Sequence, residues 1–188
     1  MTNLEDYIKV YKGWLNPEFC NEVRSEIEAA TWKQHTFYNP QDGSYSDRSG
    51  DKELDVSWDN IKTRDALTKR VWEAISQYIL TDIKSQYFNG WSGFTQIRFN
   101  RYKEDRLMAK HVDHIHSMFD GNMKGIPILS IVGMLNDDYE GGEFVMFDDK
   151  IIELKQGDIL MFPSVFLYPH EVKPVTKGVR DSFVSWVW

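Results

Sequence analysis

A histidine and an aspartate separated by one residue, His111 and Asp113, are the first pair in this sequence with the chemistry of a metal site. Because residues two apart in an extended segment face the same side, their imidazole and carboxylate can converge on one ion. The pair alone is a weak signal, since a surface histidine and aspartate near a turn give the same pattern. Further residues are needed to predict a site.

His170 adds support by its context, between Tyr168-Pro169 and a strand-like stretch at 171–173. A third ligand from a distant strand would close one face of an octahedral site. Two histidines and one carboxylate with open positions favour non-haem iron(II) and oxygen chemistry. Zinc accepts the same donors for hydrolysis, so it remains an alternative at this point.

Arg180 is a candidate for binding an anion, because it begins the last expected strand with Ser182 on the same face. An inward arginine in an apolar barrel needs an anionic partner, since an unpaired buried charge is very costly. A small dicarboxylate co-substrate would bind Arg180 and Ser182 at one end and the metal at the other, with a hydrogen bond from the Tyr102 hydroxyl. The alternative is that Arg180 pairs with Asp158 or another acid.

The elements that must position these residues are β-strands in the second half of the chain, from about residue 91. Apolar and polar residues alternate over 94–102, which predicts a strand with Arg98, Asn100 and Tyr102 on one face. The apolar run 126–135 is typical of a central strand. The last strand carries Arg180, Ser182, Val184 and Trp186 on one face, so Arg98, Asn100 and Trp186 are candidates for lining the cavity.

Two further apolar stretches, 151–154 and 159–162, flank Lys155-Gln156-Gly157-Asp158, which predicts a hairpin. Several short strands with turn signals and no intervening helices indicate a closed or double-sheet antiparallel barrel. The fold class is therefore mainly β, with the helices of the N-terminal part packed outside the barrel.

The first ninety residues predict two helices and a long loop. Asn16 and Pro17 are typical of a helix start, and apolar residues then recur every four positions. A second stripe with helical spacing begins at Leu67 and runs to about residue 82. Between them, 36–54 is rich in glycine, serine and charge, and either covers a site as a lid or is disordered.

Length and composition set the outer limits on class. A chain of 188 residues with 41% apolar and 27% charged residues predicts one domain, 1–188, with a helical part over about 1–90 and a β core over about 91–188. The net charge of −7 argues against a nucleic-acid or anionic-membrane partner. The single cysteine, Cys20, excludes an internal disulfide. With no signal peptide or membrane-spanning run expected, we predict a soluble, cytoplasmic protein.

Taken together, these residues resemble the iron(II)/2-oxoglutarate dioxygenases of the prolyl 4-hydroxylase-like group. The resemblance extends over most of the chain, and its specificity comes from the order of the motifs. In chain order they are Leu15-Asn16-Pro17-Glu18-Phe19-Cys20, Arg101-Tyr102, His111-Val112-Asp113, Leu135-Asn136-Asp137, Glu140-Gly141-Gly142-Glu143, Lys155-Gln156-Gly157-Asp158 and Lys177-Gly178-Val179-Arg180-Asp181-Ser182.

The resemblance implies a double-stranded β-helix (jelly-roll) core and a role for each candidate residue. His111, Asp113 and His170 would bind iron(II), and Tyr102, Arg180 and Ser182 would bind the distal carboxylate of 2-oxoglutarate. With O2, and with ascorbate as a candidate reductant, the enzyme would hydroxylate an unactivated C–H bond of a peptidyl residue such as proline. No catalytic residue beyond the metal ligands is implied, and His114 and His116 are expected to be surface or loop residues.

Two departures from the family pattern bear on the substrate. Arg180 stands where collagen-type and plant-type prolyl hydroxylases usually carry lysine, and Asp105 and Met108 stand where a glycine and a second tyrosine are common. A free amino acid or other small metabolite is therefore an alternative to a peptide or protein substrate. The alternative of another class is a catalytically silent jelly-roll module that binds a metal.

Overall fold

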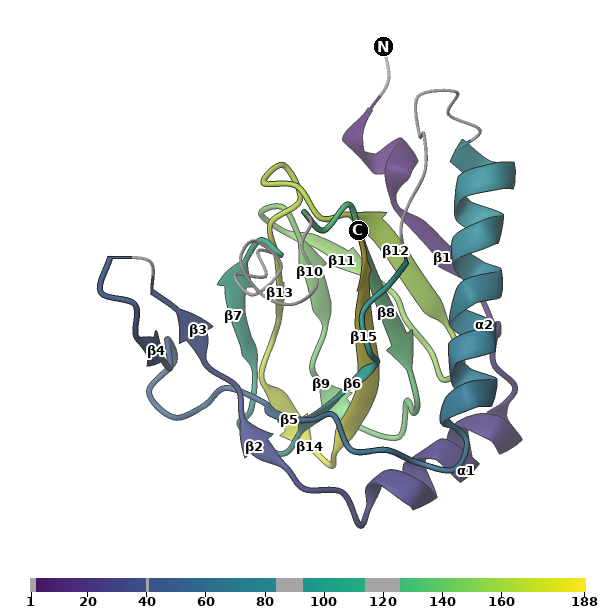
Figure 1. Ribbon diagram of the computed structural model, residues 1–188. Helices are drawn as coiled ribbons and strands as arrows, with labels where there is room; N and C mark the ends of the chain where they lie inside the picture. Colours follow the sequence, from purple (N-terminus) through teal and green to yellow (C-terminus); the bar gives the residue numbers. More distant parts are fainter. Residues whose placement is uncertain (1–2, 40, 84–92, 114–125) are drawn as a thin grey trace.

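Two helices cover one face of a large antiparallel sheet, and a smaller sheet lies against its other face (Figure 1). This computed structural model describes residues 3–39, 41–83, 93–113 and 126–188. The arrangement confirms the predicted double-sheet antiparallel architecture with the helices outside it. No helix among the described residues is both long and apolar enough to cross a membrane.

The two sheets contain most of the strands. In spatial order the seven-stranded sheet consists of β1 (Lys9–Tyr11), β12 (Ile159–Pro163), β8 (Leu129–Met134), β15 (Arg180–Val187), β6 (Arg98–Tyr102), β5 (Asp55–Ser57) and β2 (Lys33–Gln34). The four-stranded sheet consists of β11 (Lys150–Ile152), β10 (Phe144–Met146), β13 (His170–Val172) and β7 (Met108–His111). Two short pairs complete the set: β14 (Val175–Lys177) with β9 (Glu140–Gly141), and β3 (Phe37–Tyr38) with β4 (Tyr45–Ser46).

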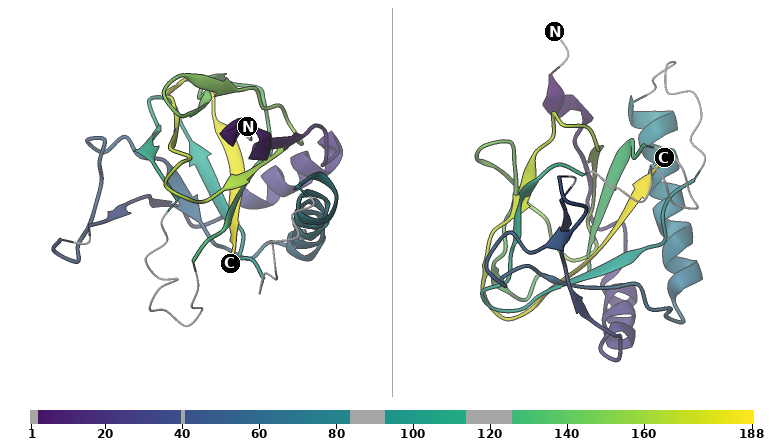
Figure 2. Two further views of the ribbon diagram at one scale, coloured as in Figure 1. Left: turned by 90° about the horizontal axis from the view of Figure 1, so that it is seen from above. Right: turned by 60° about the vertical axis from the view of Figure 1, so that its left-hand side comes forward.

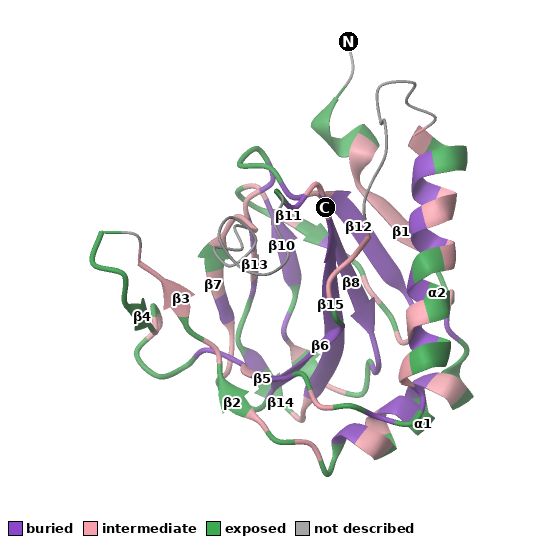
Figure 3. Ribbon diagram, viewed as in Figure 1, coloured by how far each residue is buried: buried purple, intermediate pink, exposed green. Residues whose placement is uncertain are grey.

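The predicted helices form where the sequence places their caps and stripes. Helix α1 (Pro17–Ile27) begins after Asn16, whose side chain accepts a hydrogen bond of 2.8 Å from the Phe19 N–H. Helix α2 (Arg64–Ser76) continues as a π-helical turn, η2 (Gln77–Ile83), and a short 3-10 helix, η1 (Leu4–Tyr7), precedes β1. The buried residues of α1 and α2 face the large sheet, and their exposed residues face outward (Figure 3).

Side-chain alternation along β6 and β15 gives the large sheet two different faces. Phe99 and Phe183 point toward the helices and belong to the core between helices and sheet. Tyr102, Val184 and Trp186 belong to the second core, between the two sheets. This confirms the face assignment predicted from the sequence. The space between the sheets therefore receives alternate side chains of β6 and β15, among them Arg98 and Arg180.

The predicted hairpin at 151–162 is wrong. Strand β11 pairs with β10 in the small sheet, whereas β12 pairs with β1 and β8 in the large sheet. The turn at 155–158 therefore lies on a crossover between the two sheets. Asp158 fixes this crossover by accepting hydrogen bonds from the Gly13 N–H at 2.8 Å and from Lys12 Nζ at 3.0 Å.

The segment 36–54 contains regular structure that its composition did not indicate. Strands β3 and β4 form a small hairpin that projects from the side of the molecule opposite the helices (Figure 2). Its base is attached to the edge of the small sheet, because the Leu54 N–H donates to the Leu107 carbonyl at 3.0 Å. Glu53 is fully buried there and accepts from the Ala109 N–H at 3.4 Å.

A buried ion pair on the helix side of the large sheet fixes β15 against β6. Arg101 Nε donates to Asp181 Oδ1 at 2.8 Å, and Asp181 is fully buried. Arg24 of α1 reaches the same carboxylate at 3.4 Å, so the helix is joined to both strands. Because Asp181 lies between Arg180 and Ser182, this pair also fixes the strand segment that carries both.

We expect Arg101→Met to lower the free energy of unfolding by about 3 kcal/mol, because it leaves the buried Asp181 carboxylate with only the more distant Arg24. The matched control is Glu28→Gln, since Glu28 is the other acid bound by Arg101 and its side chain is 65% exposed. That change should cost less than about 1 kcal/mol. Urea denaturation followed by circular dichroism measures both, and equal losses in the two variants would contradict this account.

Candidate metal centre

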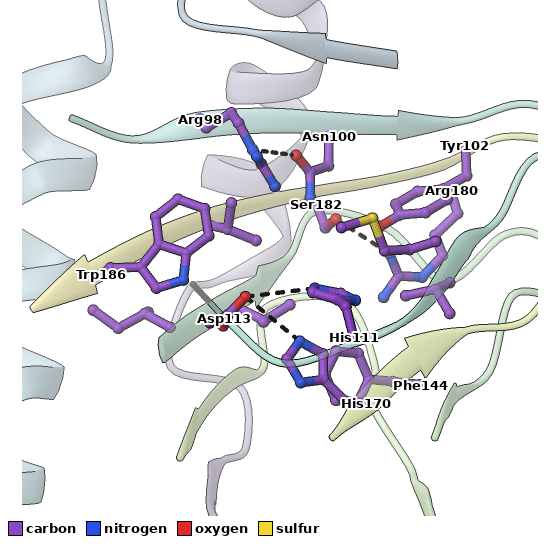
Figure 4. Close-up of a pocket in the computed structure, with 15 residues that line it drawn as sticks. Arg98, Asn100, Tyr102, His111, Asp113, Phe144, His170, Arg180, Ser182 and Trp186 are labelled. Atoms are coloured by element: carbon purple, nitrogen blue, oxygen red, sulfur yellow. Dashed lines mark hydrogen bonds and ion pairs between the residues drawn. The ribbon is translucent and has the colours of Figure 1, made fainter. Parts of the chain in front are cut away.

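Two strands of the small sheet bring the predicted metal ligands together. His111 ends β7, His170 begins β13, and the two are cross-strand partners in the antiparallel pairing. Asp113 follows two residues after His111 and is within 3.5 Å of His111 Nε2 and 3.8 Å of His170 Nε2. One ligand atom from each residue lies within 4.8 Å of those of the other two. The three side chains converge on one point at the cavity wall (Figure 4).

Backbone carbonyls fix the orientation of both imidazole rings. His111 Nδ1 lies 2.8 Å from the Ala109 carbonyl, and His170 Nδ1 lies 3.0 Å from the Tyr168 carbonyl. A carbonyl only accepts, so each Nδ1 carries a proton, and Nε2 is the ring nitrogen that faces Asp113 in both residues. Partners of this kind hold the ring orientation and the tautomer of metal-ligating histidines.

The carboxylate of Asp113 is oriented by a hydroxyl that the sequence analysis did not identify. Ser130 of β8 donates to Asp113 Oδ2 and contacts the Ser164 hydroxyl at 2.8 Å. Both serines are buried. The other oxygen, Oδ1, is left facing the two imidazoles. The available signal was a single hydroxyl residue inside the apolar run 126–135.

The environment keeps Asp113 and His170 in the protonation states that a divalent metal requires. Burial by itself would raise the pKa of Asp113, but His170 and His111, together with the Ser130 hydrogen bond, hold it below its usual range. Burial lowers the pKa of His170 to about 4. At neutral pH the site therefore presents an ionised carboxylate and a neutral imidazole, the forms that bind metal.

A cavity between the sheets adjoins the triad and is lined by all nine residues that the sequence analysis singled out. Strand β6 contributes Arg98, Asn100 and Tyr102, and β15 contributes Arg180, Ser182 and Trp186, opposite the triad (Figure 4). Phe144 of the small sheet stacks on His170, with ring centroids 5.3 Å apart. His114 and His116 lie outside the described residues.

Arg180 is buried in this cavity without an acid partner among the described residues. Its side chain is 1% exposed, and it donates to the Ser182 hydroxyl at 3.2 Å and to the Met134 sulfur at 3.3 Å. Its guanidinium lies over the Tyr102 ring at 4.8 Å, and its Nε has no partner in the described structure. Asp158, the alternative partner, binds Lys12 instead.

These residues fit iron(II) and a dicarboxylate by their own chemistry. Two imidazoles and one carboxylate on one side of a cavity form the donor set of non-haem iron oxygenases, with the remaining coordination positions open. The buried guanidinium of Arg180 has no anionic partner among the described residues, so binding an anion there would be favourable. Its planar set of N–H donors matches the geometry of a carboxylate. The donor set alone would also accept zinc.

Comparison with known proteins identifies similar sequences. The family model of the 2OG-Fe(II) oxygenase superfamily matches residues 97–188. A PKHD-type hydroxylase of Idiomarina loihiensis is 32% identical over 152 residues, which cover 77% of this chain and 66% of that protein. Another from Xylella fastidiosa is 35% identical over 107 residues, which cover 48% of this chain and 43% of the relative. The chain thus spans less than two thirds of the length of these relatives.

Solved structures confirm the fold. A prolyl-4-hydroxylase from Pseudomonas putida superposes with a TM-score of 0.66 at 20% identity, covering 96% of this chain and 91% of that one. A prolyl hydroxylase from Trichoplax adhaerens gives a TM-score of 0.70 at 16% identity, covering 97% of this chain and 84% of that one. Prolyl hydroxylases have a jelly-roll fold, so the predicted jelly-roll core is confirmed.

We expect the chain to bind one divalent metal ion. His170→Ala should weaken that binding by more than about 100-fold, because loss of a residue that only orients a metal ligand already costs about 10–100-fold, and loss of a ligand should cost more. Titration of the metal-free protein with Co(II), followed by its visible spectrum, measures the affinity. The control is His35→Phe. His35 lies near the site, with its ring 4.8 Å from Phe37, which in turn contacts His111. A similar loss in both variants would refute the assignment of His170 as a ligand.

Proposed function

We propose, from the premise that this chain belongs to the 2OG-Fe(II) oxygenase superfamily as a prolyl 4-hydroxylase-like member, that it hydroxylates an unactivated C–H bond with iron(II), 2-oxoglutarate and O2. A peptidyl residue such as proline is the proposed substrate. The observation that carries the proposal is the placement of the His111, Asp113 and His170 ligand atoms within 4.8 Å of one another beside a cavity. Ascorbate is a candidate reductant.

His111, Asp113 and His170 would hold the metal on one side and leave its other positions open to the cavity. When bound, iron(II) with 2-oxoglutarate and O2 supplies the oxidising power that breaks an unactivated C–H bond. The chain's own part is to keep the donor atoms fixed. The Ala109 and Tyr168 carbonyls hold the two rings, and Ser130 holds the carboxylate.

Arg180 and Ser182 would bind the distal carboxylate of 2-oxoglutarate. The guanidinium is already held in place by the Ser182 hydroxyl and by the face of the Tyr102 ring. Tyr102 lines the same end of the cavity, and its hydroxyl would be a further donor to that carboxylate. A carboxylate arriving here would neutralise a charge that is otherwise unpaired among the described residues.

The proposal of a peptide substrate draws on the structural neighbours. The Trichoplax adhaerens prolyl hydroxylase was solved with a hypoxia inducible factor oxygen degradation domain peptide fragment. Another neighbour is a viral collagen prolyl hydroxylase from Paramecium Bursaria Chlorella virus-1, with a TM-score of 0.62 at 14% identity, covering 96% of this chain and 94% of that one. Both neighbours are prolyl hydroxylases, one solved with a peptide fragment and one named for collagen, and this chain shares their fold.

The hairpin formed by β3 and β4 would act as a cover over the metal. Phe37 packs against the His111 ring edge to face at 5.6 Å, and Arg48 lies 4.3 Å above the Phe37 ring. These contacts place an aromatic side chain from the segment 36–54 directly beside a proposed ligand. Exclusion of water strengthens the electrostatic interactions in a site and suppresses side reactions.

The first test is the release of succinate from 2-oxoglutarate. We expect succinate formation that requires added iron(II). It should fall by more than about 100-fold in His111→Ala, because the variant lacks one of the three side chains that would hold the metal. Without oxygen, the wild type should develop a visible iron-to-2-oxoglutarate charge-transfer band, and Arg180→Gln should require a higher 2-oxoglutarate concentration for the same band. Succinate formation that persists in His111→Ala, or a wild type that gives no band, would rule the proposal out.

A second test concerns the cover. Phe37→Ala should leave Co(II) affinity within about 3-fold of the wild type, since Phe37 supplies no donor atom. It should raise the succinate released per hydroxylated product, because a less protected site permits more turnover without product. The ratio is measured with any substrate found by its gain of one oxygen atom in mass. An unchanged ratio would show that Phe37 does not protect the site.

A further inference from the structure

A second arginine is buried in the same cavity, and the proposed chemistry leaves it without a role. Arg98 of β6 is 9% exposed, and its Nε donates to Asn100 Oδ1 at 3.0 Å. Among the described residues its side chain forms no other hydrogen bond and no ion pair. Burial lowers the pKa of Arg98 to about 10, so it remains a cation at neutral pH.

The two arginines mark opposite ends of one strand pair. Arg180 is the cross-strand partner of Tyr102, and Arg98 is the partner of Val184. Tyr102 and Arg98 are four positions apart along β6, a distance of about 13 Å at 3.3 Å per residue. Figure 4 shows Arg98 at the Trp186 end and Arg180 at the Tyr102 end, with the triad facing them across the cavity.

Aromatic rings contact the guanidinium of Arg98, but most of its N–H donors have no acceptor among the described residues. Its guanidinium lies 5.0 Å from the Trp186 ring centroid and 6.0 Å from that of Trp58. Such contacts stabilise a cation above a ring, yet a guanidinium has five N–H donors in its own plane. Asn100 accepts one of them. Trp186, whose ring the guanidinium contacts, has a buried Nε1 donor that lacks a partner in the described structure and points into the cavity toward Asp113 (Figure 4).

The Arg180 and Arg98 ends of the cavity lie at different depths, and this difference indicates which ligand each end binds. Arg180 is 1% exposed and lies between a hydroxyl and a tyrosine ring, which suits a co-substrate enclosed within the site. Arg98 adjoins Trp58, which is 48% exposed, so its end lies closer to solvent. The ligand at the Arg98 end is therefore the substrate, which binds closer to solvent than the co-substrate. It must accept hydrogen bonds from the guanidinium, and an anion does so most strongly.

We propose that the substrate of this enzyme carries a carboxylate and that Arg98, with the Trp186 indole N–H, binds it beside the metal centre. The inference rests on the proposed function and specifies its substrate class. The carboxylate belongs either to a free carboxyl group, as in an amino acid or a chain end, or to an acidic side chain next to the hydroxylated residue. Arg98 thus determines substrate specificity, whereas Arg180 binds the co-substrate.

Matched acidic and neutral probes test this directly. N-acetyl-L-proline is compared with N-acetyl-L-prolinamide, and the blocked peptide acetyl-Gly-Pro-Asp-amide with acetyl-Gly-Pro-Asn-amide. Calorimetry measures their binding, without oxygen, to protein loaded with iron(II) and 2-oxoglutarate. We expect at least one acid to bind about 10-fold or more tightly than its neutral partner, because a paired charge contributes more than a neutral hydrogen bond. The pair that shows the preference identifies the source of the carboxylate.

Variants separate Arg98 from the rest of the site. Arg98→Gln should reduce the acid preference to less than about 2-fold while leaving the 2-oxoglutarate band intact, and Arg98→Lys should keep part of it by retaining the charge. The control is Lys103→Gln, which removes the same charge from an exposed side chain next to β6 that pairs with Asp55 at 3.1 Å. That variant should keep the full preference.

The outcomes distinguish failure of this inference from failure of the proposed function. A wild type without the charge-transfer band would refute the proposed function itself. With the band present, the carboxylate assignment is overturned if no acid is preferred over its neutral partner or if Arg98→Gln keeps the preference. Loss of the band in Arg98→Gln would also overturn it, because Arg98 would then belong to the co-substrate site.

Discussion

The antiparallel pairing of β7 with β13 is the constraint on which the site depends. It makes His111 and His170 cross-strand partners although two strands of the small sheet and two strands of the large sheet lie between them in the sequence. Each ring is then fixed by the carbonyl two residues before it, so both Nε2 atoms face Asp113. A shift of one residue in this register would turn one imidazole to the opposite face of the sheet and remove it from the centre.

Arginines on the two faces of the strand pair β6 and β15 have opposite environments, paired on one face and without an acid partner on the other. On the helix side, Arg101 is paired with the buried Asp181, and Arg24 joins them. On the cavity side, Arg98 and Arg180 have no acid partner among the described residues. The paired arginine holds the strands in register, and that rigid frame keeps the unpaired ones in place. Unpaired buried cations are tolerated where a ligand supplies the missing charge.

The sequence predicted what depends on local periodicity and missed what depends on long-range pairing. Alternation predicted a strand over 94–102, of which 98–102 forms β6, and it assigned the cavity faces of β6 and β15 correctly; Asn16 likewise marked the correct helix start. The hairpin expected around 155–158 was wrong because a turn signal does not show which sheet each flanking strand joins. Ser130 was passed over because a hydroxyl in an apolar strand has meaning only once Asp113 lies beside it. The metal-binding roles of the triad remain predictions.

The charges that line the cavity link the three proposed ligands. The described residues that line the cavity include two guanidiniums and one carboxylate, that of Asp113. Burial keeps His170 neutral. With both imidazoles neutral, as metal ligation requires, the cavity wall is positive by one charge inside a chain whose net charge is −7. A divalent metal and doubly negative 2-oxoglutarate would cancel each other, so one positive charge would remain. A substrate with a single carboxylate neutralises it, and a buried site favours the ligand that leaves no charge unpaired.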